Sequence, residues 1–172
     1  DTTTVSTVDQ FNKALDEGKS DITVTEPLTF NQKVDIQGVI IRASDNVSKN
    51  FLTFTGGGTL ADVNVITAQN TKSAIHIYKC DMTITNLTVD HSLNDGGAPV
   101  LVNGEGSKAT FTGNLDMTLG SKSWYGVNVD KGTADFTSAN IMCNTVADTQ
   151  SVVCLDNSNA QSVTGLPYST VT

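Results

Sequence analysis

Apolar residues recur at alternate positions in short segments along most of the chain. A period of two is typical of β-strands, because successive side chains of a strand point to opposite faces. One set of apolar doublets returns at intervals of 23, 25, 27 and 26 residues, and each doublet runs into a turn. This set comprises Leu52/Phe54, Ile75/Ile77, Val100/Val102, Val127/Val129 and Val153/Leu155. The regular return predicts a repeated structural unit.

A second set of apolar doublets begins directly after small or amide-type residues. These junction residues are 24 to 28 positions apart, and they are Gly38, Asp62, Asn86, Asn114, Asn140 and Gly165. With a middle strand before each junction, every unit holds three short strands. We therefore predict an all-β fold, a right-handed parallel β-helix (solenoid) of about six rungs. A β-sandwich is the alternative, but it does not require amide residues at equivalent sites.

The start of the chain has a helical pattern instead. Residues 6–19 place Val8, Phe11, Ala14 and Leu15 on one face, which predicts an amphipathic helix. Ser6 or Thr7 is the expected N-cap, and Gly18 is the expected stop. We predict one domain over 1–172, with an N-terminal capping helix in 1–20 and the rungs in 21–172. We also expect the chain to be a fragment of a longer secreted protein.

The junction residues carry a resemblance to a known family. Asn86, Asn114 and Asn140 resemble the asparagine ladder of the pectate-lyase-like β-helix superfamily, whose members also have a helical cap. The resemblance implies inward, stacked Asn side chains, with Asp62 extending the ladder. It also implies that a polysaccharide would bind on the outer face of the first strands. The outward positions there are Thr53, His76, Leu101, Asn128 and Cys154.

Composition and charge limit the partners. The chain has 10 Lys and Arg against 18 Asp and Glu, for a formal net charge of -8. Such a chain repels phosphates and anionic lipid, so we expect no nucleic acid partner. No apolar run is long enough for membrane insertion of this fragment. The abundance of Thr, Ser, Asn and Gly fits an extracellular or cell-surface protein.

The three cysteines are expected in different environments. Cys143 falls at an inward position, Cys154 at an outward one, and Cys80 in a turn. An odd count does not make a complete disulfide framework, and no spacing resembles a zinc site.

The signature residues of enzymes with this fold are missing. Pectate lyases use a basic residue to abstract a proton beside a uronate carboxylate, and acidic residues to hold calcium. The only arginine, Arg42, lies near the capped end, and the outward positions of the first strands carry no Lys. The NTD, DD, GHG and RIK motifs of polygalacturonases are also absent from the sequence. We predict no catalytic residue, no metal ion and no cofactor.

Several polar and aromatic residues remain candidates for ligand binding at the expected cleft. They are His76, Tyr78, Asp90, His91, Trp124, Tyr125 and Asn128. Asp90 and His91 also fit an ordinary solvated loop, and Trp124 also fits a wedge packed over its turn.

The first functional hypothesis is a non-catalytic, adhesin-like module of a bacterial surface or secreted protein, which binds glycan or another surface polymer or protein. The alternatives are a polysaccharide lyase or hydrolase that departs from known motifs, and a structural spacer or assembly module.

Overall fold

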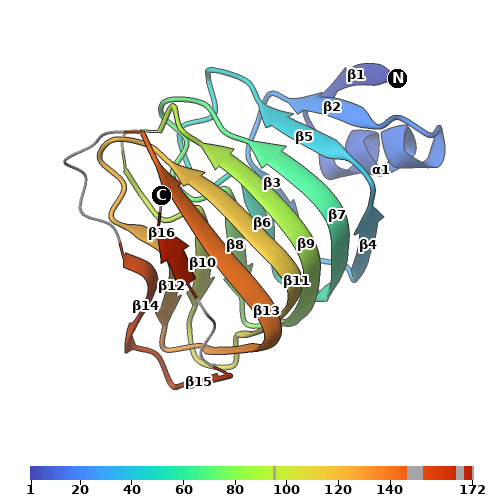
Figure 1. The fold of residues 1–172 in the computed structure, drawn as a ribbon. Helices are drawn as coiled ribbons and strands as arrows, with labels where there is room; N and C mark the ends of the chain where they lie inside the picture. The colour runs from blue at the N-terminus through green and yellow to red at the C-terminus, as the bar shows by residue number, and fades with distance from the viewer. Residues whose placement is uncertain (95, 147–152, 166–168, 172) are drawn as a thin grey trace.

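A computed structural model describes residues 1–94, 96–146, 153–165 and 169–171. The described chain is a parallel β-solenoid, in which strands from successive turns lie side by side (Figure 1). Two parallel sheets form its walls and α1 (Val8–Asp16) lies at one end. The predicted all-β parallel fold with an N-terminal capping helix is confirmed.

Within the described residues, sheet B contains six strands, one from each pass of the chain. They are β3 (Leu28–Phe30), β6 (Leu52–Phe54), β8 (Ile75–Tyr78), β10 (Val100–Asn103), β12 (Tyr125–Asp130) and β14 (Val153–Asn159). The register pairs Leu52 with Ile75, Ile75 with Val100, and Val100 with Val127. The doublets predicted to stack therefore do stack, up to β12.

Sheet A contains the other ten strands of the part of the chain that the structure describes. They are β1 (Thr2–Val5), β2 (Asp21–Val24), β4 (Val34–Gln37), β5 (Ile40–Ala43), β7 (Gly58–Ile66), β9 (Asp81–His91), β11 (Lys108–Leu119), β13 (Thr133–Thr145), β15 (Ser162–Thr164) and β16 (Ser169–Val171). β7, β9, β11 and β13 are long and curve around the solenoid (Figure 1). Each covers both the second and the third strand predicted for its unit, so the junction bends the strand without ending it.

The asparagine ladder differs from the predicted one. Asp62 and Asn86 have the left-handed backbone expected at junctions, with φ of 54° and 52°, but in the next unit Gly113 takes this role with φ of 71°. The register shifts by one residue there, so Asn114 follows the bend and pairs with Asn140.

All four ladder side chains are exposed, where inward stacking was predicted for Asp62, Asn86, Asn114 and Asn140. Asn86 Nδ2 donates to Asp62 Oδ1 at 3.3 Å, and the backbone N–H of Asn114 donates to Asn86 Oδ1 at 3.0 Å. The physical reason at Asp62 and Asn86 is that the left-handed bend turns the side chain away from the core and toward the neighbouring rung. The ladder thus joins three rungs on the outer surface.

The interior is filled by apolar side chains stacked from rung to rung. Phe30 stacks on Phe54 with ring centroids 5.0 Å apart, and Phe111 on Phe136 at 4.8 Å. Equivalent positions carry the same residue type, so flat rings face each other at about the spacing of parallel strands.

Helix α1 covers the first rung. Thr7 is its N-cap, and Thr7 Oγ1 accepts a hydrogen bond from Gln10 N at 3.1 Å. Phe11 is buried and meets Phe30 edge-on with centroids 5.4 Å apart. Gly18 ends the segment with φ of 78°. Before the helix, β1 pairs with β2 and extends sheet A, an element that the sequence pattern did not predict.

The corner that leads into sheet B buries one residue more than a strict alternation allows. From β6 to β14, the residue that comes just before the first inward-facing residue of the strand is buried as well. These residues are Phe51, Ala74, Pro99, Gly126 and Cys154. Cys154 was predicted to face outward with Val153 inward. That prediction is wrong, because Cys154 is buried and Val153 is exposed.

Candidate functional site

The outer side of sheet B carries a row of residues in register, one from each strand. We call this the sheet B face, and its central row is Thr29, Thr53, His76, Leu101, Asn128 and Asp156. His76 and Asn128 were predicted here. Asp156 was missed because the predicted register of the last strand, which put Cys154 beside Asn128, was two residues too early.

His76 is held by polar neighbours on this face. Its Nδ1 lies 3.3 Å from Asn50 Nδ2 and 3.4 Å from Thr53 Oγ1. Because an amide N–H donates to Nδ1, the neutral ring carries its own proton on Nε2, which is buried without a hydrogen-bond partner. Burial lowers the pKa of His76 below its usual value. His76 is therefore a neutral ring at neutral pH.

Tyr78 lies on the outer side of the same strand, two residues after His76. Their ring centroids are 5.8 Å apart, and Lys79 Nζ lies 5.2 Å from the Tyr78 ring centroid. Gly104 makes room for the ring, since a Cβ there would come within 3.1 Å of Tyr78 Cε1. The ring is 37% exposed and presents an aromatic surface at the end of β8.

Trp124 directly precedes β12 and is 68% exposed. Its backbone carbonyl accepts a hydrogen bond from Val153 N at 2.8 Å, so the adjacent strand fixes the backbone at this residue. Tyr125 pairs in register with Val153, and Tyr125 is half-buried. Trp124, Tyr125 and Val153 therefore form an aromatic and apolar cluster at the start of β12, and Asn128 follows on the same strand.

A second polar row follows the ends of these strands. Tyr78 pairs with Asn103, and Asp130 pairs with Asn159. Asn159 Nδ2 donates to Asp130 Oδ1. The alternation of the first strands, continued for two positions, identifies Tyr78, Asn103 and Asp130 from sequence. Asn159 comes beside Asp130 through a register shift between β12 and β14 that alternation does not contain.

Asp90 and His91 lie apart from this face, at the end of β9 in sheet A. Asp90 Oδ1 accepts from Ser92 N at 3.1 Å and from Ser92 Oγ at 2.6 Å, which closes a local turn. His91 is completely buried, and its Nδ1 lies 2.6 Å from Thr67 Oγ1. Burial lowers the pKa of His91 to about 4. The structure does not bring these two residues together with His76.

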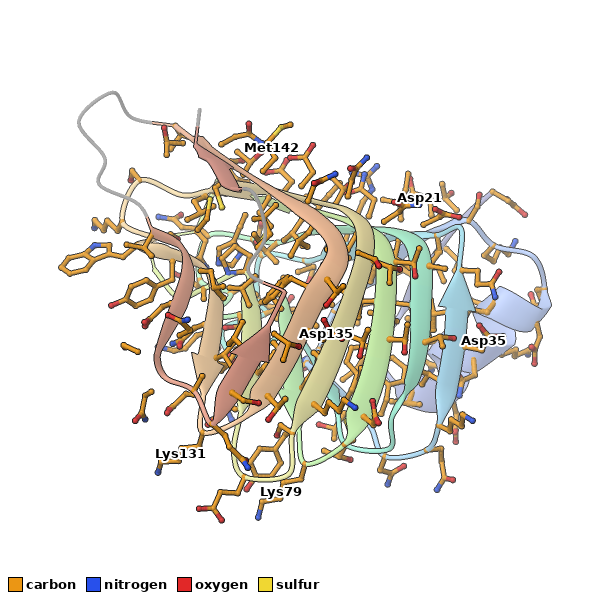
Figure 2. All side chains as sticks on the ribbon, turned by 60° about the horizontal axis from the view of Figure 1, so that its bottom comes forward. Asp21, Asp35, Lys79, Lys131, Asp135 and Met142 are labelled. Carbon is orange, nitrogen blue, oxygen red and sulfur yellow. The ribbon has the colours of Figure 1, made fainter. Side chains whose placement is uncertain are left out.

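Charged side chains lie mainly on other surfaces. Figure 2 shows Asp35 and Asp135 on the outer side of sheet A, and Lys79 and Lys131 at the edge where strands of sheet B end. Within the part of the chain that the structure describes, no group of three or more His, Cys, Asp or Glu residues could hold a metal ion.

Over the described ranges, no helix combines the length and apolar composition that crossing a membrane requires.

No family model matches this chain, and neither the curated proteins nor the solved structures include one that is significantly similar to it.

Proposed function

We propose that this chain is a non-catalytic, adhesin-like module of a secreted or surface-exposed bacterial protein, and that it binds a glycan along the sheet B face. The observation that carries the proposal is the exposure of Trp124 beside Tyr125 and the in-register row containing Asn128. The flat apolar face of the exposed indole suits the C–H face of a sugar ring.

The polar residues of the face complement this stacking surface. The amide of Asn128 can donate to and accept from sugar hydroxyls. Asp156 and Asp130 add acceptor oxygens on the neighbouring positions. With these carboxylates and a net charge of -8, the face favours a neutral glycan over a polyuronate or a sulfated chain.

The fold also supports membership of the pectate-lyase-like superfamily as part of this proposal. A parallel solenoid with a helical cap is the architecture that the sequence resemblance implies, although fold alone does not assign activity.

Affinity measurements over a panel of neutral and acidic polysaccharides test the proposal. We expect saturable binding to a neutral polysaccharide, weakened about fivefold or more by Trp124→Ala, since an aromatic contact is worth about 1 kcal/mol or more. The matched control is Met142→Ala, which removes a side chain 45% exposed on the outer side of sheet A (Figure 2). Equal weakening by both variants would contradict the assignment to sheet B.

The same panel separates the alternatives. Absence of binding to every glycan would support a spacer or assembly module. Release of reducing or unsaturated ends from any polysaccharide would support an enzyme.

A further inference from the structure

Two of the three cysteines meet inside the solenoid near its C-terminal end. Cys143 lies at an inward position of β13 in sheet A, in register with Met117. Cys154 lies at the corner leading into β14 of sheet B. Both are buried, with 0% and 5% of their surface exposed. They therefore lie in the interior near the corner between the end of β13 and the start of β14.

Gly126 on β12 shows how closely these cysteines approach. It lies beside Cys154, because Tyr125 pairs with Val153 and Val127 pairs with Leu155. A Cβ placed on Gly126 would lie 2.7 Å from Cys143 Sγ and 2.6 Å from the carbonyl oxygen of Cys154. Because Gly126 has no side chain, the Cys143 sulfur can lie close to the backbone of Cys154.

The two thiols also contact each other directly. The Cys143 thiol hydrogen-bonds to Cys154 Sγ, which raises the pKa of Cys143 and lowers the pKa of Cys154. Cys154 is consequently the thiol that ionises first.

We propose that Cys143 and Cys154 form a disulfide that ties sheet A to sheet B at the C-terminal rungs. The Cys154 thiolate attacks one sulfur of a low-molecular-weight disulfide and releases one small thiol. Cys143 then loses its proton, and its sulfur displaces the second small thiol from Cys154. The two protein thiols give up two protons and two electrons in total, and the small disulfide takes them up.

Cys80 is the internal control for this reaction. It lies in the turn between β8 and β9, and its Sγ donates to the carbonyl of Phe54 at 3.2 Å. Burial raises its pKa above the ordinary value, so its thiolate is scarce. Cys80 stays reduced while the other pair is oxidised.

The bond adds a covalent link between the two sheets. Cys143 and Cys154 are close in the chain, with ten residues between them. Closing this short loop reduces the freedom of the unfolded chain and holds β14 against β13.

The test is a thiol map of the whole chain refolded in oxidised and reduced glutathione. The chain is denatured, alkylated without reductant and digested, and the peptides are identified by mass spectrometry. We expect a linked peptide pair containing Cys143 and Cys154, and alkylation of Cys80 alone among the three cysteines. Alkylation of all three, or any disulfide that contains Cys80, would overturn the proposal.

Variants give an independent measurement. Reductant should lower the Tm of the oxidised wild type and of Cys80→Ser, and should leave the Tm of the Cys143→Ser/Cys154→Ser double variant unchanged. A reductant-sensitive Tm in the double variant, or an insensitive one in Cys80→Ser, would also contradict the assignment.

Discussion

At the residue scale, His91 shows how the polar content of the corner loops is accommodated. Its ring is buried on β9 and contacts Thr67 through Nδ1. A charged imidazolium would lose its hydration there, so the pKa falls from 6.5 to about 4. The sequence identified His91 as a ligand candidate because it could not distinguish this buried position from the half-buried Asp90 turn beside it.

This burial predicts a dependence of stability on pH. Below pH 6.5 the unfolded chain binds a proton at His91 that the folded chain excludes until about pH 4. The free energy of unfolding should therefore fall by up to about 3 kcal/mol as the pH drops through this window. The lowered pKa values of Asp21, Asp35 and Asp135 reduce stability mainly below their ordinary value of 3.8, and so contribute little within this window.

Urea unfolding at about pH 7 and about pH 4.5 checks this prediction. His91→Gln should lose clearly less stability than the wild type over that interval. The small remaining loss should come from His76, whose pKa is also lowered. If His91→Gln and the wild type lose the same stability, His91 is not responsible.

Gly113 provides a second prediction at this scale. Its φ of 71° favours glycine, and a Cβ there would lie 2.1 Å from Asn86 Oδ1. Gly113→Ala should lower the free energy of unfolding by about 2 kcal/mol or more, from backbone strain plus displacement of Asn86. In an Asn86→Gly background the same substitution should cost about 1 kcal/mol, the backbone part alone. Equal costs in both backgrounds, measured by urea unfolding, would argue against the Asn86 contact.

At the element scale, helix α1 and the strands of sheet B follow directly from local pattern. The helix has a capping hydroxyl at Thr7, an apolar face and a terminal glycine, and each of these features is readable from the sequence. The doublets of sheet B stack because the chain returns to the same register after each turn.

The helix should contribute to stability mainly through Phe11. Phe11→Ala removes a buried ring from its contact with Phe30 and should lower the free energy of unfolding by about 3 to 4 kcal/mol. Lys13→Ala, on the exposed side of the same helix, should change it by less than about 0.5 kcal/mol. Thermal unfolding of the two variants measures the difference. A cost for Phe11→Ala as small as that for Lys13→Ala would show that the helix does not cover the core.

Three features of the elements could not be predicted from the pattern. β1 is too short and polar to stand out, and it forms because β2 offers an unpaired edge. The bend at Gly113 depends on one additional residue between Phe111 and Leu115, which alternation cannot locate. Cys154 is buried because the corner admits two consecutive inward residues, a property of the turn that a period of two does not contain.

At the scale of the whole molecule, the strands of sheet B form an extended outer surface. Six parallel strands of sheet B span about 24 Å at their usual spacing of about 4.8 Å. A glycan that crosses the strands would meet one residue of the central row at each rung. The candidate residues His76 and Asn128 lie on this path, whereas Asp90 and His91 belong to the other wall.

This geometry predicts that affinity depends on glycan length. For the neutral polysaccharide that binds, affinity should rise with oligosaccharide length and level off once the chain covers the face, because each additional sugar adds contacts at another rung. Calorimetric titration of a length series measures this effect. The same affinity for a disaccharide and for the longest oligosaccharide would point to a compact pocket in place of an extended face.

The most direct test of the central claim is an NMR titration of the isotopically labelled 18.1 kDa chain with the bound oligosaccharide. We predict saturable shift changes at the backbone amides of β8, β10 and β12 and at the Trp124 indole N–H, with little change along β9, β11 and β13. Changes confined to the strands of sheet A, or no saturable change at any residue, would contradict glycan binding by the sheet B face.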